Sequence, residues 1–212
     1  MIKIALVDDH VILRKSLSVL IGMLQDFNVM MEAGNGKEFI DQLNKDNIPD
    51  IVLMDITMPV MDGVETTKWI KQNHPNIKVV ALSMIKNDLI IIRMLKNGAR
   101  GYILKDCEPE ELRYALREVY EKGYFYNELV TPRMKVKEVD KEEPLQKSMI
   151  NEGELSFLRW ACTEKTYKEI ADEMGVSART VDGYRDALFQ KLQVTTRVGL
   201  AIYAIRHELV TL

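Results

Sequence analysis

The spacing of apolar and polar positions divides the chain into three segments. Over residues 1–123, short aliphatic runs alternate with stretches in which apolar residues recur every three or four positions. The runs predict five strands, over residues 2–7, 29–32, 51–54, 77–82 and 101–104. Because these runs are apolar almost throughout, the strands should be buried on both faces. The first segment therefore predicts an α/β doubly wound fold, with a five-stranded parallel sheet between two layers of helices.

The second segment, residues 124–148, has no regular spacing of apolar residues. It contains Pro132, Pro144 and several Lys and Glu residues, a composition that cannot bury much surface. We expect it to be a linker.

The third segment, residues 149–212, has only the helical spacing. Three helix starts are marked by capping residues, namely Asn151 with Glu154, Thr166 with Glu169, and Ser177 just after Gly175. A glycine-containing turn between the second and third helices is typical of a helix-turn-helix, whose later helix enters the major groove of DNA. A small all-α DNA-binding domain is the prediction.

Polar residues follow the strands of the first segment, and they form a candidate site. They are Asp8 and Asp9 after the first strand, Asp55 after the third, Ser83 after the fourth and Lys105 after the fifth. The carboxyl ends of parallel strands meet at one edge of a sheet, so these side chains should share a cleft. Crowded carboxylates need a cation, and Mg²⁺ prefers oxygen ligands.

This set of groups suits transfer of a phosphoryl group. A carboxylate can attack phosphorus, and an ammonium can neutralise charge on the transferred oxygens. Asp55 is the candidate nucleophile, Lys105 its counter-charge, and Ser83 a donor to a phosphoryl oxygen.

The first segment resembles receiver domains, which are flavodoxin-like. The resemblance is carried by Val-Asp-Asp-His at 7–10, Leu-Met-Asp-Ile-Thr-Met-Pro-Val-Met-Asp-Gly at 53–63, Leu-Ser-Met at 82–84 and Gly-Tyr-Ile-Leu-Lys-Asp at 101–106. It implies a metal site at Asp8, Asp9, Asp55 and the backbone carbonyl of Thr57, a phosphoacceptor at Asp55, and switch or phosphate-contacting roles for Ser83, Tyr102 and Lys105. Asp106 stands where many receivers carry a cis-bonded proline, which leaves the isomer of that peptide bond open.

The third segment resembles the LuxR-type DNA-binding domain. The matching residues are 166–181, Tyr184-Arg185 and Lys-Leu-Gln-Val at 191–194. The order of domains is that of NarL/FixJ-like transcription regulators. The resemblance implies phosphate contacts by Arg179, Thr180, Arg185, Lys191 and Arg197, and helical spacing places Arg179, Asp182, Gly183, Asp186 and Gln190 on the groove-facing side.

Charge supports this interpretation in part. Residues 177–206 contain five Arg or Lys against two Asp, whereas residues 150–176 contain three against six Asp or Glu. Positive charge is therefore concentrated where phosphate contacts are needed. Asp182 and Asp186 are unusual on such a helix, although a carboxylate can accept a hydrogen bond from the cytosine amino group.

Composition and charge argue against several classes of protein. The net charge of −3 disfavours a wholly basic nucleic-acid coat protein. Cys107 and Cys162 have no metal-like spacing, so we expect reduced thiols. The sequence has no apolar run long enough for a membrane span and no recognisable signal peptide, so a cytoplasmic protein without a membrane partner is expected.

The expected function is that of a two-component response regulator. A sensor histidine kinase or a small phosphodonor would phosphorylate Asp55, and a homodimer would then bind double-stranded DNA, with Val198 and Ile202 as a candidate dimer contact. Asp55-Ile56-Thr57 lacks the second carboxylate of an Asp-x-Asp hydrolase, so multiple-turnover catalysis is not expected. The alternative is a phosphorylated interaction module whose DNA-binding domain has degenerated.

Overall fold

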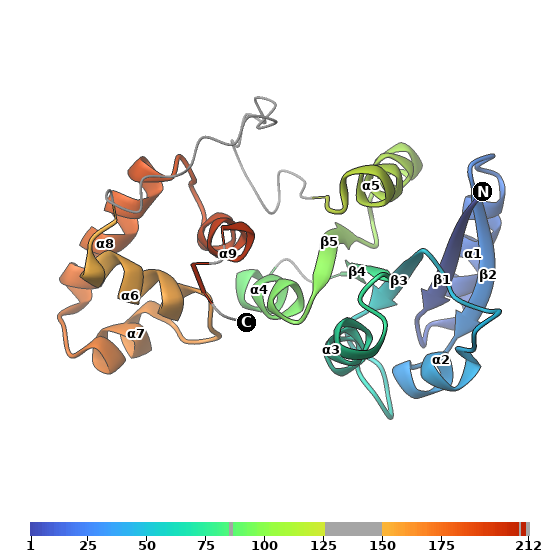
Figure 1. Ribbon diagram of the computed structural model, residues 1–212, viewed down its shortest axis with the longest axis horizontal. Helices are drawn as coiled ribbons and strands as arrows, with labels where there is room; N and C mark the ends of the chain where they lie inside the picture. The colour runs from blue at the N-terminus through green and yellow to red at the C-terminus, as the bar shows by residue number, and fades with distance from the viewer. Residues whose placement is uncertain (85–86, 126–149, 208, 211–212) are drawn as a thin grey trace. The chain divides into compact units, whose positions relative to one another are not determined.

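The computed structural model describes residues 1–84, 87–125, 150–207 and 209–210 (Figure 1). Its contacts divide the chain into two compact units, Met1–Lys86 with Asn97–Tyr126, and Asn87–Lys96 with Asn127–Leu212. Helix α4, Asp88–Lys96, is thereby grouped with the second unit. Most of the expected linker, from residue 126 to 148, lies outside the described residues, and the domain boundaries at 123 and 149 stay predictions.

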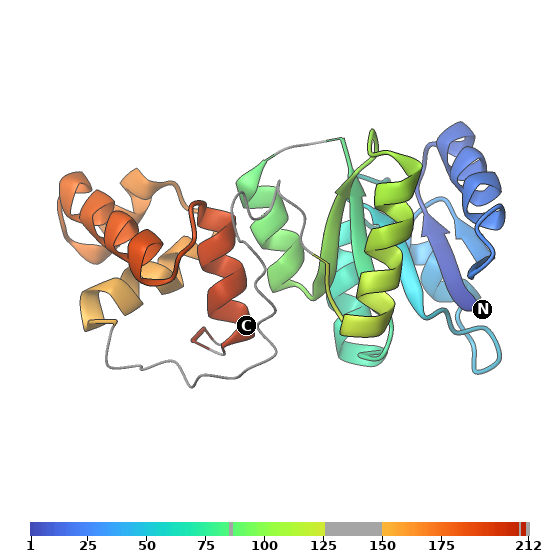
Figure 2. The ribbon, with the colours of Figure 1, turned by 90° about the horizontal axis from the view of Figure 1, so that it is seen from above.

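The first unit is built on a parallel sheet, which confirms the predicted fold class (Figure 2). The strands are β1 (Ile2–Val7), β2 (Phe27–Ala33), β3 (Ile51–Asp55), β4 (Lys78–Ser83) and β5 (Ala99–Leu104). They pair in the order β2-β1-β3-β4-β5, and every pair is parallel. The order changes direction next to β1, and in doubly wound sheets ligands bind at such a point, beyond the carboxyl ends of the strands.

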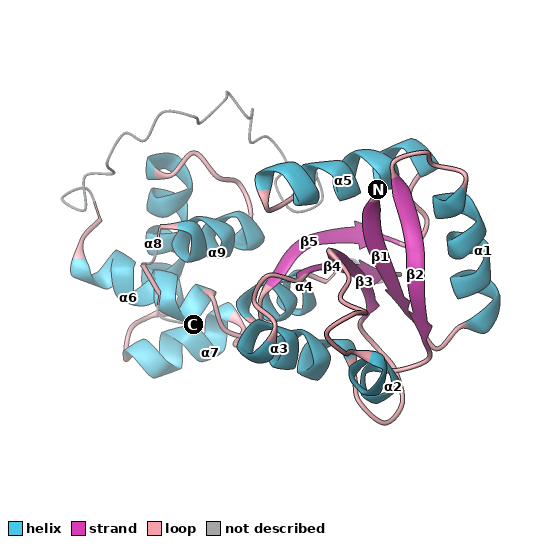
Figure 3. Ribbon diagram, turned by 45° about the vertical axis from the view of Figure 1, so that its right-hand side comes forward, coloured by secondary structure: helices cyan, strands magenta, loops and turns pink. Residues whose placement is uncertain are grey.

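Helices cover both faces of this sheet. Figure 3 shows α1 (Val11–Gly22) and α5 (Pro109–Lys122) on one side, with α2 (Gly36–Gln42) and α3 (Gly63–Asn73) on the other. The core beneath α1 and α5 combines alternate strand residues with helix residues, among them Ile4, Leu53, Val80, Ile21 and Leu116. This apolar layer holds the strand ends rigidly in register, which matters for the site they carry.

Two strands begin earlier than the apolar pattern predicted, since β5 starts at Ala99 rather than at residue 101 and β2 also starts early. The pattern placed the second strand at residues 29–32, but β2 begins at Phe27. Asn28 interrupts the run of apolar residues, yet it pairs with Lys3 of β1, and Phe27 is 2% exposed. Pairing with a neighbouring strand therefore recruits a polar position that local spacing excludes.

The second unit contains the predicted helices. They are α6 (Glu152–Ala161), α7 (Tyr167–Met174), α8 (Ala178–Lys191) and α9 (Arg197–Arg206). Both predicted capping boxes are formed, and the Ser177 side chain accepts a hydrogen bond from the Thr180 N–H at the start of α8. Gly175 ends α7 with φ +64°, a left-handed conformation that glycine adopts without strain. The α7-turn-α8 pair is therefore a helix-turn-helix.

Two charged side chains hold the helices of the second unit together. Lys191 Nζ lies 2.7 Å from both carboxylate oxygens of Glu154, which is 3% exposed. Arg197, 7% exposed, donates from Nε to the Ala161 carbonyl at 2.8 Å and from Nη2 to the Thr163 carbonyl at 2.9 Å. These carbonyls lie at the end of α6, where helical partners are missing, so Arg197 caps that helix.

Two further expectations concern the state of the cysteines and the presence of membrane-spanning helices. Cys107 and Cys162 are both free thiols, and burial raises the pKa of each to about 11. Among the described helices, none is long and apolar enough to cross a membrane.

Replacing Arg197 should destabilise the helical unit. In Arg197→Ala the α6 carbonyls lose buried, charge-assisted hydrogen bonds, and we expect the free energy of unfolding to fall by about 2–4 kcal/mol. Urea unfolding can be followed by the fluorescence of Trp160, which lies on α6, in a Trp69→Phe background. Arg179→Ala is the matched control, because Arg179 is exposed on α8, and its effect should stay within about 0.5 kcal/mol. Equal effects of the two substitutions would contradict the capping role.

Candidate functional site

Four strands bring polar side chains to one edge of the sheet. Asp8 follows β1 and is 3% exposed, Asp55 ends β3 at 5%, and Ser83 ends β4 at 2%. Lys105 follows β5, and its backbone N–H donates to the Ser83 carbonyl at 2.9 Å. The structure thus gathers the side chains at the carboxyl ends of the strands in one cluster.

An ammonium group joins the two most buried carboxylates of this cluster. Lys105 Nζ lies 2.8 Å from Asp8 Oδ2 and 2.9 Å from Asp55 Oδ2, and all three side chains are nearly inaccessible to solvent. Burial alone would lower the pKa of Lys105, but the hydrogen bonds and charges of Asp8 and Asp55 outweigh it and raise that pKa. Lys105 is therefore a fixed positive charge.

Asp55 is held less firmly in its charged form. Burial raises its pKa, and the neighbouring charge of Asp8 adds to the effect, although Lys105 and the Ile56 N–H both oppose it. The Ile56 N–H donates to Asp55 Oδ1 at 2.8 Å, and Lys105 contacts Oδ2. Burial destabilises the charged form of Asp55, and the single ammonium of Lys105 compensates for this only in part. Such a carboxylate is well suited to bind a cation or to react with an electrophile.

The cluster fits a divalent cation. One potential ligand atom each from Asp8, Asp9, His10 and Asp55 lies within 4.8 Å of the others. Asp8 Oδ2 is buried and has the ammonium of Lys105 as a partner at 2.8 Å, while Asp8 Oδ1 lies toward His10. Carboxylate oxygens gathered in this way are what a hard cation such as Mg²⁺ would use. Thr57 lies two residues beyond β3 and is exposed.

Ser83 and Tyr102 meet next to this cluster. Tyr102 is 1% exposed, and Ser83, which is 2% exposed, is near enough to oppose the rise of the Tyr102 pKa. Burial raises the pKa of Tyr102, and the charge of Asp55 acts in the same direction. The two residues expected to form a switch therefore lie beside each other. Among the described residues no peptide bond is cis, so the bond between Lys105 and Asp106 is trans.

Gly63 allows the loop after Asp55 to close. Its backbone N–H donates to the Ile56 carbonyl at 2.9 Å at the start of α3. A Cβ at Gly63 would overlap the Asp55 carbonyl oxygen and lie 2.9 Å from Ile56 Cα. Only glycine fits this close approach.

The candidate DNA-contacting residues differ in their exposure and in the bonds they form within the domain. Arg179, Asp182, Gly183 and Asp186 are exposed on α8, and Thr180 and Arg185 are half-buried there. Lys191 and Arg197, by contrast, bind Glu154 and the end of α6. Val198 and Ile202, the candidate dimer contact, are 0% and 2% exposed, so a dimer through them would require rearrangement.

Arg185 is paired with both unusual aspartates of α8. Its Nη1 lies 2.8 Å from Asp182 Oδ1, and its Nη2 lies 2.9 Å from Asp186 Oδ1. The guanidinium also stands 5.5 Å from the centroid of the Tyr167 ring. The acidic residues therefore do not leave α8 with an uncompensated negative face.

Comparison with known families decides the class of protein. Residues 4–117 match the family model of the response regulator receiver domain, and residues 152–204 match that of the bacterial regulatory proteins of the luxR family. The chain belongs to the response regulators. It combines a receiver domain with a LuxR-type DNA-binding domain, as the sequence predicted, and neither matched family is an enzyme family.

Two curated proteins match the chain over nearly its whole length, and a solved structure matches more than half of it. The transcriptional regulatory protein LnrK of Bacillus subtilis is 33% identical over 98% of both chains. The response regulator protein VraR of Staphylococcus saprophyticus is 32% identical over 99% of both. A crystal structure of a LuxR-family two-component response regulator from Aurantimonas sp. is 31% identical, covers 59% of this chain and 88% of its own, and superimposes with a TM-score of 0.55.

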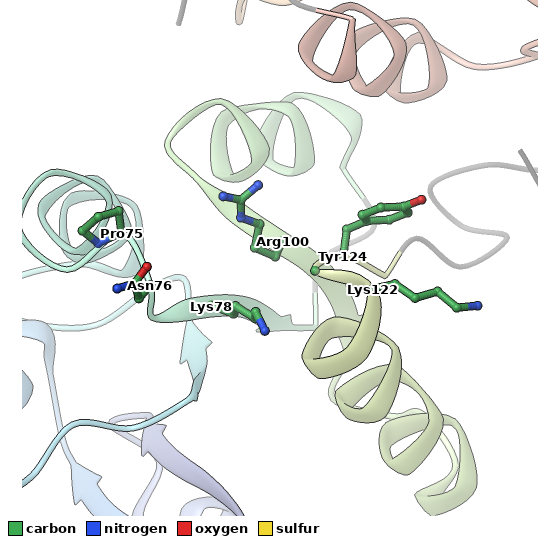
Figure 4. Close-up of a pocket in the computed structure, with 7 residues that line it drawn as sticks. Pro75, Asn76, Lys78, Arg100, Lys122 and Tyr124 are labelled. Atoms are coloured by element: carbon green, nitrogen blue, oxygen red, sulfur yellow. The ribbon is translucent and has the colours of Figure 1, made fainter. Parts of the chain in front are cut away.

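A hollow of the response regulator lies near the starts of β4 and β5 (Figure 4). It measures about 400 Å³ and is lined by Lys78 at the start of β4, Arg100 near the start of β5, Lys122, Gly123, Tyr124, Pro75 and Asn76. It has cationic side chains but no carboxylate, so it cannot supply the phosphoacceptor.

Sequence reasoning missed one member of the acidic cluster of the response regulator. His10 was not among the site residues that the sequence predicted, and it occupies the N-cap of α1. Its Nδ1, however, lies 3.0 Å from Asp9 Oδ1 and 3.1 Å from Asp8 Oδ1. Its position directly after two aspartates at a strand end was the available signal.

Substituting Gly63 should disturb the site through the backbone of Asp55. Gly63→Ala is expected to lower the free energy of unfolding of the receiver by about 1–3 kcal/mol, because the new methyl group overlaps main-chain atoms. The fluorescence of Trp69, on α3, reports unfolding of this domain in a Trp160→Phe background. Gly22→Ala is the control, since a Cβ there meets nothing within 4 Å. If the Gly63→Ala protein were as stable as the control, the loop would have space for a Cβ, and the requirement for glycine would be wrong.

Proposed function

We propose that this response regulator accepts a phosphoryl group on Asp55, and that phosphorylation controls binding of its α8 helix to DNA and thus transcription. The observation that carries the proposal is the buried contact of Lys105 with both Asp8 and Asp55. This contact places the ammonium of Lys105 beside the carboxylate of Asp55, whose charged form is only partly stabilised. This arrangement favours attack on a phosphorus atom whose oxygens carry negative charge.

The transfer step needs few groups. A carboxylate oxygen of Asp55 forms a bond to phosphorus, and the bond from phosphorus to nitrogen in a sensor histidine kinase, or to oxygen in a small phosphodonor, breaks. The electron pair of that bond leaves with the donor. Asp8, Asp9 and Asp55, with the Thr57 carbonyl, would hold Mg²⁺, which when bound neutralises charge on the transferred oxygens. The protein would modify itself once and would not turn over external substrates.

Response to the phosphoryl group is assigned to three residues. Lys105 would remain its counter-charge, and the Ser83 hydroxyl would donate to one of its oxygens. Because Ser83 lies beside buried Tyr102, recruitment of Ser83 to the phosphoryl group would change the surroundings of the tyrosine and let it move. The acyl phosphate would thereby be coupled to the carboxyl ends of β4 and β5.

DNA binding is assigned to the exposed face of α8. We propose phosphate contacts by Arg179, Thr180 and Arg185, and base contacts near Asp182, Gly183 and Asp186. Lys191 and Arg197 were also expected to contact phosphate, and their internal bonds give them a supporting part instead. Domains of this size bury little surface singly, so a homodimer on a two-fold DNA site would supply affinity.

The phosphoacceptor assignment is tested by removing one carboxylate. With a small phosphodonor and Mg²⁺, the wild-type chain should gain a single acid-labile phosphate, detected by intact-protein mass spectrometry. Asp55→Asn should gain none, because the amide is a poor nucleophile. Asp50→Asn is the matched control, because Asp50 precedes the same strand and only accepts from the Lys3 N–H. Phosphate on Asp55→Asn at the wild-type level would overturn the assignment.

The consequence for DNA is tested by selection from a random or genomic pool, with and without phosphodonor. We expect enrichment of a two-fold sequence, stronger after phosphorylation and not enhanced in Asp55→Asn. The rival function, an interaction module that no longer binds DNA, is favoured by the pairing of Arg185 with Asp182 and Asp186, since it engages a cation needed for phosphate contact. No enrichment in either state would overturn the DNA-binding proposal and leave the rival.

A further inference from the structure

The imidazole of His10 lies among the carboxylates of the acidic cluster, and the transfer of a phosphoryl group as described makes no use of it. Its Nδ1 is 3.0 Å from Asp9 Oδ1, 3.1 Å from Asp8 Oδ1 and 3.8 Å from Asp55 Oδ2. With one oxygen of each carboxylate it forms a group of four potential ligand atoms within 4.8 Å of one another. Nitrogen is therefore available at a site that otherwise offers oxygen.

The backbone directs this side chain to the cluster. His10 is the N-cap residue of α1, but its side chain forms no capping hydrogen bond. Its backbone N–H donates to Asp8 Oδ1 at 2.8 Å, and its carbonyl accepts from the Arg14 N–H at 2.9 Å. The residue is thus anchored on both sides, while its side chain is 67% exposed and open to an ion arriving from solvent.

The spacing of the atoms suits ligands of one small cation. Around an octahedral ion with ligands at about 2.1 Å, adjacent ligand atoms are about 3 Å apart. The distances from Nδ1 to Asp8 and Asp9 have this length. A hydrogen bond from Nδ1–H to a carboxylate has the same length, so distance alone does not separate the two arrangements and a spectroscopic measurement is needed.

We propose that His10 is a further ligand of this metal site and that it makes the site prefer later first-row divalent ions, such as Co²⁺, over Mg²⁺. An all-oxygen set suits Mg²⁺, whereas imidazole strengthens binding of transition metals much more than of Mg²⁺. The proposal deepens the assignment of the metal site and rests on it. The cation that supports phosphorylation would then depend on which divalent ions compete in the cell.

Direct coordination can be detected with Mn²⁺ as the probe. The full chain, with any affinity tag removed, is loaded with Mn²⁺, and electron spin-echo envelope modulation is recorded. We expect modulation from one imidazole nitrogen, retained in His74→Ala and His207→Ala and lost in His10→Ala. These are the three histidines of the chain, and His74 and His207 lie at the ends of α3 and α9.

Selectivity is measured by displacing Mn²⁺ with Co²⁺ and with Mg²⁺. His10→Ala should weaken Co²⁺ binding at least about tenfold, the loss seen when even an outer-sphere partner is removed, and Mg²⁺ binding no more than about twofold. His10→Gln, whose amide supplies an oxygen, should leave Mg²⁺ binding unchanged without restoring Co²⁺ binding.

The possible outcomes distinguish the role of His10 from the assignment of the metal site, on which it rests. If Mn²⁺ binds wild-type protein without nitrogen modulation, or if His10→Ala weakens Co²⁺ and Mg²⁺ equally, His10 is not a selective ligand and the carboxylate site stands. If Mn²⁺ does not bind at all, or if Asp55→Asn and Asp8→Asn bind it as the wild type does, the metal site itself is wrong.

Discussion

The receiver depends on one buried electrostatic arrangement, in which Lys105 stands between Asp8 and Asp55. Two carboxylates and an ammonium at the end of an apolar sheet are costly to bury unless their geometry is close to ideal. The parallel sheet supplies that geometry, because β1, β3 and β5 end at the same edge and the core beneath α1 and α5 holds their register. Removing Lys105 would leave two buried carboxylates side by side without a counter-charge, whereas removing either aspartate would leave a single Lys–Asp pair.

Much of this arrangement follows from local features of the sequence. Apolar runs that end in Asp8, Asp55 and Ser83 place those residues at strand ends whatever the details of packing, and parallel topology then brings them together. The helix starts at Asn151, Thr166 and Ser177 are equally local, because a cap depends on residues within one turn.

Contacts between elements distant in sequence were not predictable in the same way. Lys191 meets Glu154 across 37 positions, and Arg197 reaches Ala161 across 36. Both were expected to contact DNA phosphate because the resemblance to LuxR-type domains implied that role. Burial of Glu154 and the open carbonyls of α6 instead require a partner, and only the packed fold shows that these cations provide it. His10 was missed because its side chain direction depends on backbone bonds at the N-cap.

The pairing of Arg185 with Asp182 and Asp186 bears on how fast a DNA site is found. Of the cations on α8, Lys191 is bound to Glu154 and Arg185 to its two aspartates, while Arg179 makes no ion pair within the described chain. Ion pairs within the domain weaken the long-range field of α8, so its attraction for a polyanion is smaller than the number of its cations suggests. Encounter with DNA would then be steered less by charge than it is for a strongly basic helix. The selectivity of such a DNA-binding helix would come from slow dissociation at matching sites rather than from rapid association.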